Sequence, residues 1–379
     1  MPNPPLAPSF GVEETFFLVD RRSRNLPPQL PEGLLQAGRA AFDGGFSQEM
    51  FQSLVHLDMA QPNLVEMAEA RASLLERRTR LAAIADDHHL APVCVGSHPF
   101  ADWHVQMPSV DPHYQSFFED HRMIAHRSLA CGMRVQVVVP ENVDRILVMN
   151  RVLDWLPLLL ALSTSSPLWA GRPTGLMSYR QALCAEWPHK GIPEHFPDEP
   201  SFTAYVQWLM ASGSIRRESD LSWRIRPSPR FPALELLGID ACPSVEDALC
   251  VASLFRALVA WSMDQTADEP QDPLLQRLIL KENHWRAMRF GIHGLYLDAS
   301  GEASLSAGAW LARAHACFGE LAEAEGDGLA FTRGRHILRY GSSADRQLQR
   351  YRESLQAGLP RQQALVAVVD ELIAETCGG

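Results

Sequence analysis

The sequence predicts an α+β fold built on a mostly antiparallel sheet. Four segments, at 10–20, 90–100, 133–139 and 234–240, have the alternation and β-branched or aromatic content of strands. Helical periodicity occurs between them, but without the regular strand–helix–strand order of a parallel sheet. The helices are therefore expected to flank the sheet.

The first predicted strand, FGVEETFFLVD, carries two adjacent carboxylates. Alternation places Gly11, Glu13 and Thr15 on one face and Glu14 on the other. Gly11 has no side chain, which leaves room for a ligand near the backbone beside Glu13. Alternatively, Glu13 and Glu14 are solvated charges at the start of a strand.

The strand within CGMRVQVVVPE, residues 131–141, has an unusual polar face. Met133 points to one side, whereas Arg134 and Gln136 share the other. Core strands rarely carry polar side chains, and surface strands more often carry Lys, Thr or Glu. The pair therefore indicates a specialised face.

Two arginines lie on one face of a strand in SWRIRPSPRFPALELLGID. Arg224 and Arg226 alternate before a rigid PSP corner, and Glu235 follows on the next strand. Two such arginines repel each other unless carboxylates or a bound anion lie opposite. Arg–Glu bridges closing a hairpin and an anion site are equally compatible with this pattern.

Three long helices are predicted at 69–89, 143–162 and 245–263. Ser244 precedes the last of them with Asp247 three residues on, which predicts a helix cap.

Other polar side chains are embedded in apolar sequence, where a structural hydrogen-bonding role is commoner than ligand contact. They are His98, Thr174, Ser178, Arg180, Asn283, Arg286 and Arg289, and Gly291 is expected to end the helix that carries the last three.

Composition argues against several classes of partner. A net charge of −11 without any Lys/Arg-rich segment argues against nucleic-acid binding. The apolar stretch 155–171 is interrupted by Pro157 and Pro167 and is shorter than the ~20 apolar residues of a spanning helix, so we expect a buried helix and no membrane.

The cysteines and the amino-terminal residues favour a cytoplasmic protein. Seven cysteines are scattered without a CxxC pair, which disfavours disulfides and zinc ribbons. The first ten residues lack the pattern of a signal peptide, and no GxGxxG or P-loop motif is present. Segments 187–200 and 264–273 are predicted to be exposed loops rather than domain boundaries, giving a single domain over 1–379.

Seven motifs in order carry a family resemblance: GVEE, GSHPFADW, CGMRVQV, LPLLLALSTSSPLWAGRPTGLMSYR, WRIRPSPRFPALEL, NHWRAMRFG and SSADRQ. Together they resemble the type 2 glutamate–cysteine ligase family, the YbdK-like carboxylate–amine ligases, over nearly the whole chain. The resemblance implies a fold like the catalytic domain of glutamine synthetase, with metal and nucleotide on the concave face of a curved sheet. It also implies ATP-dependent joining of a carboxylate to an amine through an acyl-phosphate, with Mg²⁺ and typically with glutamate and cysteine.

Several positions depart from the family pattern. Thr15 stands where a second carboxylate is expected, Arg134 and Gln136 replace two histidines, and Arg224 replaces an aspartate. Leu237 replaces an arginine, and Pro173 replaces an aspartate. Guanidinium in place of imidazole removes a metal ligand and adds a fixed positive charge, so a conventional site with two or three metals is not expected.

The retained residues suggest roles by resemblance. Glu13, Glu66 and Glu235 are expected to hold one Mg²⁺, and Arg226 and Glu235 to be catalytic. Substrate or nucleotide binding is expected from Arg134, Gln136, Arg180, Arg224, Ser228, Asn283 and Arg289.

Two functions remain open at this point. The first is a carboxylate–amine ligase with a reduced metal site, acting on an amino acid or another small carboxylate. The second is a non-catalytic relative whose Arg-lined pocket binds an anion or a partner protein. A changed reaction is a residual third, because no Ser-His-Asp or Cys-His spacing is evident. The resemblance also makes a homo-oligomer, or a complex with another protein, an expectation.

Overall fold

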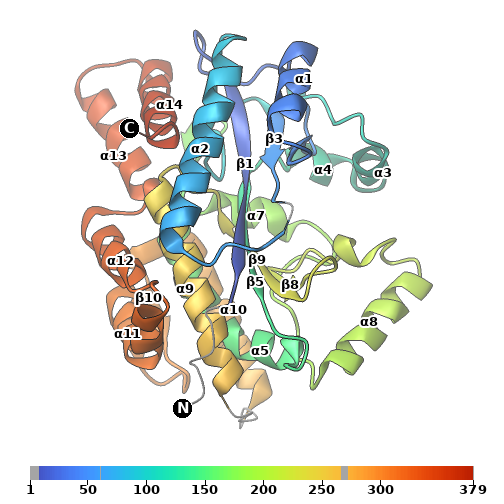
Figure 1. Cartoon of the computed structure of the whole chain (residues 1–379). Helices are drawn as coiled ribbons and strands as arrows, with labels where there is room; N and C mark the ends of the chain where they lie inside the picture. Colours follow the sequence, from blue (N-terminus) through green and yellow to red (C-terminus); the bar gives the residue numbers. More distant parts are fainter. Residues whose placement is uncertain (1–7, 60, 266–271, 379) are drawn as a thin grey trace.

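A seven-stranded sheet runs through the molecule in a computed structural model that describes residues 8–59, 61–265 and 272–378 (Figure 1). The strands pair antiparallel in the order β2-β3-β1-β5-β9-β8, and β4 also pairs with β1. The strands are β1 Phe10–Asp20, β2 Phe46–Gln48, β3 Leu54–Leu57, β4 Leu90–Val93, β5 Gly132–Val138, β8 Ile225–Pro227 and β9 Ala233–Asp240. The predicted α+β fold is confirmed. Most of the predicted acidic loop, residues 266–271, lies outside the described residues.

The register of the central strands aligns the polar residues of the site. Glu13 of β1 lies opposite Arg134 of β5, and Gln136 lies opposite Glu235 of β9. On β8, Arg226 lies opposite the same Glu235. Residues far apart in the sequence therefore lie in two neighbouring rows across the sheet, Glu13 with Arg134 in one and Gln136, Glu235 and Arg226 in the other.

The predicted strand at 90–100 is shorter than expected and ends at Val93. Side-chain hydroxyls rather than a neighbouring strand bind the following N–H groups: Cys94 donates to Thr376 Oγ1 at 3.0 Å and Gly96 to Ser165 Oγ at 2.9 Å. Without a partner strand, the extended segment cannot continue the ladder.

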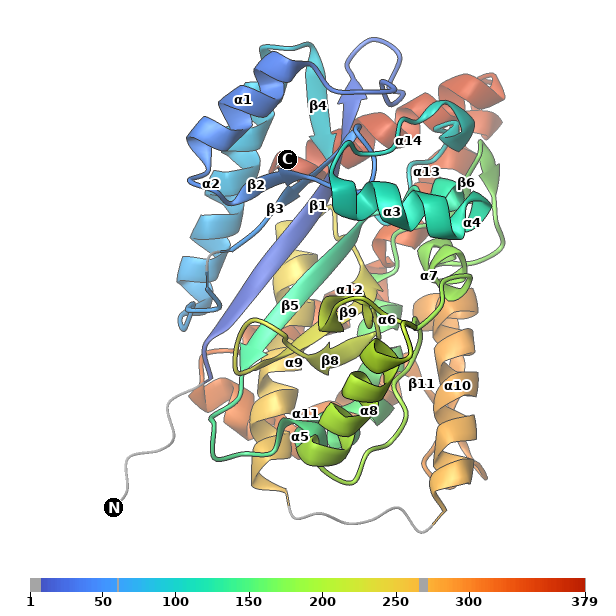
Figure 2. The ribbon, with the colours of Figure 1, turned by 90° about the vertical axis from the view of Figure 1, so that its right-hand side faces the viewer.

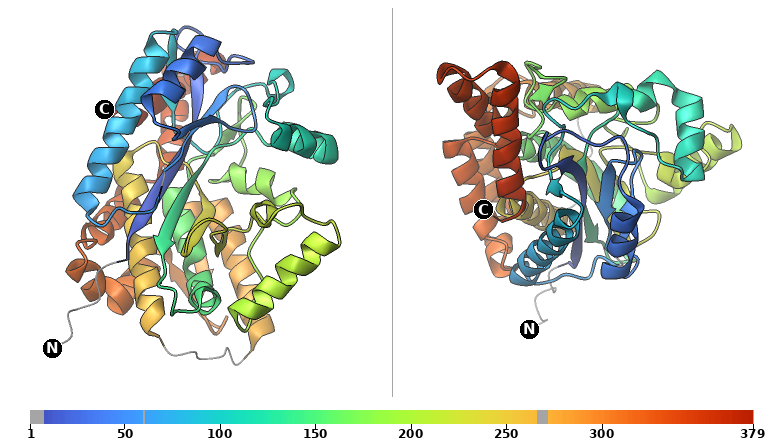
Figure 3. Two further views of the ribbon diagram at one scale, coloured as in Figure 1. Left: turned by 45° about the vertical axis from the view of Figure 1, so that its right-hand side comes forward. Right: turned by 90° about the horizontal axis from the view of Figure 1, so that it is seen from above.

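Helices cover one face of the sheet (Figures 1 and 3). Arg78 of α2 reaches Glu14 of β1, and the long α9 is buried along almost its whole length. A carboxy-terminal group of helices packs outside α9 and along the edge of this layer. The covering helices are α2 Met67–Asp86, α6 Leu156–Ser163, α9 Val245–Asp264, α11 Ala307–Ala324, α12 Leu329–Tyr340, α13 Ser343–Gln356 and α14 Arg361–Thr376.

Shorter segments border the opposite face (Figure 2). They leave the polar side chains of β1, β5 and β8 at the wall of a cavity. The bordering and remaining helices are α1 Glu32–Ala41, α3 Pro112–His121, α4 Met123–Arg127, α5 Arg145–Val152, α7 Tyr179–Ala185, α8 Glu199–Ala211 and α10 Pro273–Phe290. Two small sheets pair β6 Leu168–Trp169 with β7 Arg172–Pro173 and β10 Leu295–Leu297 with β11 Ser304–Ser306.

The predicted helix at 143–162 is broken into α5, a 3₁₀ turn at Leu153–Trp155, and α6. Pro157 explains the break, because it lacks an N–H and its ring clashes with a preceding carbonyl. Arg145–Ser163 is long and apolar enough to span a membrane by length and composition alone, but 83% of the 18-residue window tested is buried inside the fold. The predicted buried helix is confirmed.

Ser244 is the N-cap residue of α9, as predicted, but its side chain accepts no capping hydrogen bond. Asp247 instead pairs with Arg333 at 2.7 Å and with Arg346 at 3.1 Å. The carboxylate is drawn to two guanidinium groups from α12 and α13, which a local sequence pattern does not include.

Both carboxylates of β1 are buried, so the alternative of solvated charges is wrong. Glu14 faces the helical layer and binds Arg78 of α2, whose side chain is also buried. Arg78 donates further to the carbonyls of Cys242 and Pro243. Loss of one partner from such a buried pair typically costs ~3–5 kcal/mol. Glu14 therefore holds α2 on the sheet, while Glu13 faces the cavity.

Candidate functional site

The open face of the sheet holds a cavity of about 640 Å³. Its walls come from β1, β3, β5 and β8 and from α3 and α7, with Thr15, Arg134 and Arg226 among the lining residues. The Glu13 face predicted from alternation is thus the face that borders the cavity.

Glu13 is buried, and three side chains donate hydrogen bonds to its carboxylate. Its Oε2 accepts from Arg134 Nη1 at 2.8 Å, and its Oε1 accepts from Gln136 Nε2 at 2.9 Å and Arg230 Nη2 at 3.2 Å. The two unusual side chains of β5 therefore bind the carboxylate of β1. Their positions explain the polar face of that strand.

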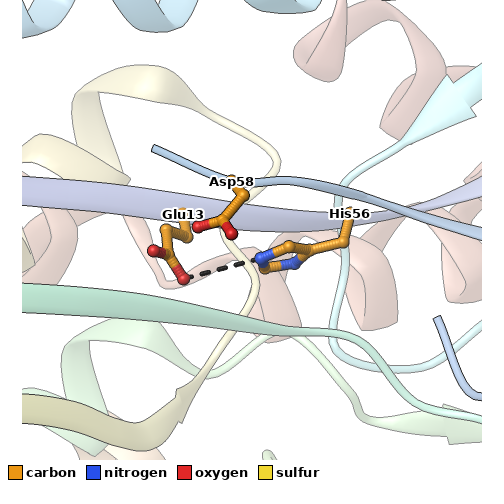
Figure 4. Close-up of side chains that lie close together, drawn as sticks. All are labelled: Glu13, His56 and Asp58. Carbon is orange, nitrogen blue, oxygen red and sulfur yellow. Dashed lines mark ion pairs between the residues drawn. The ribbon is translucent and has the colours of Figure 1, made fainter. Parts of the chain in front are cut away.

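A second carboxylate and an imidazole lie beside Glu13 (Figure 4). Ligand atoms of Glu13, His56 and Asp58 lie within 4.8 Å of one another, and His56 Nε2 is 3.5 Å from Glu13 Oε2. Burial acts to raise the pKa of Asp58, but contacts with Glu13, Arg230 and His56 outweigh it and lower that pKa to about 2. Asp58 is therefore ionised at neutral pH.

These three residues fit a single divalent cation. Asp58 Oδ1 is buried and has no hydrogen-bond partner, and oxygen donors with an imidazole suit a hard or borderline ion. Arg230 forms ion pairs with Glu13 and Asp58, but its side chain is 44% exposed, so it can move toward solvent. His56 and Asp58 were not predicted from the sequence, although their alternation in LVHLD places both on one strand face.

Glu235 is engaged in a different way. Its Oε2 accepts from Arg226 Nε at 2.9 Å and its Oε1 accepts from Ser228 Oγ at 2.8 Å, with both charged side chains almost fully buried. Arg226 also donates to the carbonyls of Ser219 and Leu221. The interpretation as an Arg–Glu bridge in a hairpin is confirmed for this pair.

The expected metal set of Glu13, Glu66 and Glu235 is not brought together in the part of the chain that the structure describes. Glu66 is exposed at the start of α2, after a bridge between Phe10 and Leu64 that carries the chain out of the sheet. Both oxygens of Glu235 bind the β8 hairpin, as described above. The residues that lie close to Glu13 are instead His56 and Asp58.

Arg180 and Arg224 line the same cavity on the β8 and β9 side. Arg180 donates from Nη1 to the carbonyl of Ile239 at 2.8 Å. Arg224 is almost fully buried, but its Nε has no partner among the described residues. Unlike Arg226, Arg224 forms no ion pair with a carboxylate among the described residues, which fits the anion-site interpretation.

Asn283 and Arg289 lie on α10 and do not join this cluster in the described structure. The Asn283 side chain donates to the Leu297 carbonyl at 2.8 Å and accepts from the Leu297 N–H at 2.7 Å, which fixes β10 to the helix. Arg289 stacks on Phe290, with 5.0 Å between its Cζ and the ring centroid. Neither lines the cavity that contains Arg134.

His98 is a structural residue, as its isolated position suggested. Its ring is buried, with Nε2 2.9 Å from the Arg24 carbonyl, and Nδ1 accepts from the N–H groups of Phe100 and Ala101. Burial lowers the pKa of His98 to about 4, so the imidazole is neutral. Cys131 is likewise buried, and burial raises the pKa of its thiol.

Comparison with known proteins decides the family. The family model described as Glutamate-cysteine ligase family 2 (GCS2) matches residues 9–365. The chain belongs to this family. A relative from Pseudomonas putida is 41% identical over 370 residues, spanning 97% of this chain and 98% of its own. One from Pseudomonas paraeruginosa is 43% identical over 367 residues, spanning 97% of this chain and 95% of its own. Both carry the name glutamate–cysteine ligase 2 as a provisional assignment.

Solved structures share the fold at low sequence identity. A glutamate–cysteine ligase from Francisella tularensis, in complex with AMP, superposes with a TM-score of 0.71 at 10% identity and covers 99% of this chain and 90% of its own. A bifunctional glutathione synthetase from Pasteurella multocida gives 0.70 at 16% identity, covering 97% of this chain and 52% of its own. Family and fold together support an ATP-dependent carboxylate–amine ligase, as the seven motifs predicted.

Proposed function

We propose that this chain joins the carboxylate of a small molecule, an amino acid or a related acid, to an amine at the expense of ATP, with one divalent cation at Glu13, His56 and Asp58. The observation that carries the proposal is the convergence of these three side chains: their ligand atoms lie within 4.8 Å of one another, and His56 lines the cavity of about 640 Å³. A cavity of this size suits a small-molecule ligand.

Magnesium bound there would neutralise phosphate charge and orient the phosphate for transfer to the acid. This chain's own residues hold the ligand oxygens in place. Gln136 fixes one oxygen of Glu13, and Arg134 places a permanent positive charge 2.8 Å from the other. In a site with a single metal, Arg134 supplies charge stabilisation that needs no second ion.

Arg230 acts as the mobile member of the site. It bridges Glu13 at 3.2 Å and Asp58 at 3.3 Å. Because Arg230 binds the two carboxylates that would hold the ion, the ion and the guanidinium compete for them. The side chain is partly exposed, so it can move away into solvent. Release of Arg230 toward the nucleotide phosphates would keep the charge of the cavity balanced.

The test is ATP turnover with paired substrates. Purified protein is incubated with Mg²⁺-ATP, glutamate and a panel of amines that includes cysteine, and ADP release is measured with each component omitted in turn. ADP release that requires both acid and amine supports the proposal. Glu13→Gln preserves shape but removes the charge, and should lower the rate by about 10²–10³-fold, the scale of one lost preorganised contact.

A second function is favoured by one specific observation. Glu13 and Glu235, the two buried carboxylates on the open face of β1 and β9, are both bound by guanidinium groups. A relative without catalytic activity that binds an anion would need this arrangement and no metal. It predicts that no combination of acid and amine stimulates ADP release, while anions still bind.

A further inference from the structure

We propose that Arg180, Lys190 and Arg224 form a subsite for a doubly charged oxoanion, a phosphoryl group or a pair of carboxylates on the ligand. It lies on the β8 and β9 side of the cavity, across β5 from Glu13, His56 and Asp58. The inference rests on the proposed function for the source of the anion, but the subsite can be tested without turnover.

The fold builds this cluster from three separate segments. Arg180 and Cys184 lie four residues apart on one face of α7. The chain then returns through Lys190, because the next residue, Gly191, bridges Trp223 and its carbonyl accepts the Arg224 N–H at 2.8 Å. Lys190 and Arg224 are thereby fixed beside each other.

Glycines allow the two arginines to lie close against the sheet. A Cβ at Gly132 of β5 would lie 2.2 Å from Arg180 Nη2, and a Cβ at Gly238 of β9 would lie 2.6 Å from Arg224 Cβ. Any other side chain at Gly132 would displace the Arg180 guanidinium. The backbone is therefore shaped around these cations.

The three cations lack sufficient carboxylate partners among the described residues. The Nε of Arg224 is buried and unpartnered, and Lys190 contacts the Trp187 ring, with Nζ 3.9 Å from its centroid. The nearby carboxylate, Asp240, is fully buried and already accepts from Ser166 and Ser178. Asp240 offsets at most one of the three positive charges, and the excess of positive charge suits an oxoanion.

The titration of neighbouring groups agrees with this excess of positive charge. Burial and Arg180 lower the pKa of Arg224 to about 10. Burial also lowers the pKa of Lys190, and the adjacent arginines lower it further. Burial acts to raise the pKa of Cys184, but Lys190, Arg180 and Arg224 outweigh it and lower that pKa. A bound dianion would relieve the repulsion among these cations.

The chain offers an internal control, because Lys190 and Lys281 are its only two lysines. Reductive ¹³C-methylation keeps the charge of both and gives two side-chain NMR signals besides that of the amino terminus. The protein is titrated with inorganic phosphate, succinate, acetate and ATP in EDTA at constant ionic strength. Lys190 should shift saturably with phosphate or succinate, whereas exposed Lys281 on α10 should not.

Variants assign the effect to the subsite. Arg224→Met and Gly132→Ala, the latter without any change of charge, should each weaken phosphate or succinate binding by roughly tenfold or more. Lys281→Met is the matched control and should leave the affinity for phosphate and succinate unchanged. A larger response to ATP than to phosphate identifies a nucleotide as the source, and preference for succinate identifies the acid substrate.

Equal shifts of both lysines, a response to acetate as strong as that to succinate, or unchanged binding in Arg224→Met would each overturn the subsite. Mg²⁺-dependent ATP binding and ADP release are measured on the same samples. Failure of the subsite with turnover intact therefore differs from failure of the proposed function.

Discussion

Replacing Arg226 by methionine should destabilise the protein because Glu235 would stay buried without its charged partner. The two side chains are 7% and 1% exposed, and the N–O distance between them is 2.9 Å. Loss of one member of a buried pair typically costs ~3–5 kcal/mol, and the carbonyls of Ser219 and Leu221 also lose a donor. We therefore expect Arg226→Met to lower the free energy of unfolding by ~3–5 kcal/mol.

Urea denaturation followed by circular dichroism measures this change. Ser228→Ala, which removes only one neutral donor to Glu235, should cost ~1 kcal/mol. The double variant Arg226→Met/Glu235→Leu should recover most of the loss, because it leaves no buried charge unpaired. A loss below 1 kcal/mol in Arg226→Met, or additive effects in the double variant, would refute a structural pair and return Glu235 to the expected metal-ligand role.

Three further predictions concern pH and metal. The folded pKa of His98, about 4, lies below its usual value of 6.5, so the neutral imidazole contributes stability that is present above pH 6.5 and lost as the pH falls toward 4. Between pH 7 and pH 4, the free energy of unfolding of His98→Gln should therefore fall by ~3 kcal/mol less than that of the unmodified protein. An equal fall in both proteins, measured by urea denaturation at the two pH values, would contradict this. Arg230→Ala should raise Mg²⁺ affinity about tenfold by calorimetry, with exposed Arg39→Ala unchanged, because it frees Glu13 and Asp58. Arg134→His with Gln136→His should also raise Mg²⁺ affinity, and an unchanged affinity would show that β5 does not face the ion.

Local periodicity was sufficient to predict the elements that position the site. The 10–20 strand matches β1 residue for residue, and the faces assigned to Glu13 and Glu14 are the faces observed, because alternation in a strand is fixed by backbone geometry. The 245–263 segment matches α9 to within one residue. The broken helix at Pro157 was less well predicted, since apolar content continues across the break.

Partners across the sheet could not be predicted in the same way. Arg134 and Gln136 were recognised as unusual, but whether they face an anion or Glu13 depends on the register of β1 with β5. Glu66 was expected in the metal site from the family resemblance alone, yet it is exposed at the start of α2. His56 belongs to a strand of only four residues, too short for a clear periodic signal.

The retained charge pattern now has a physical interpretation. Arg226 is a structural partner of Glu235, Arg134 is a partner of Glu13, and Arg224 is left without a carboxylate partner among the described residues. The carboxylates of Glu13 and Asp58 therefore lie on one side of β5, and the excess positive charge of Arg224 lies on the other.

Calorimetric titration of ATP, in excess Mg²⁺ and again in EDTA, tests the central claim most directly. With a cation site at Glu13, His56 and Asp58, Mg²⁺ should strengthen ATP binding at least about tenfold, and Glu13→Gln should abolish that gain while leaving the weaker binding in EDTA. Equal affinity in both conditions, unchanged by Glu13→Gln, would contradict a metal-assisted ligase.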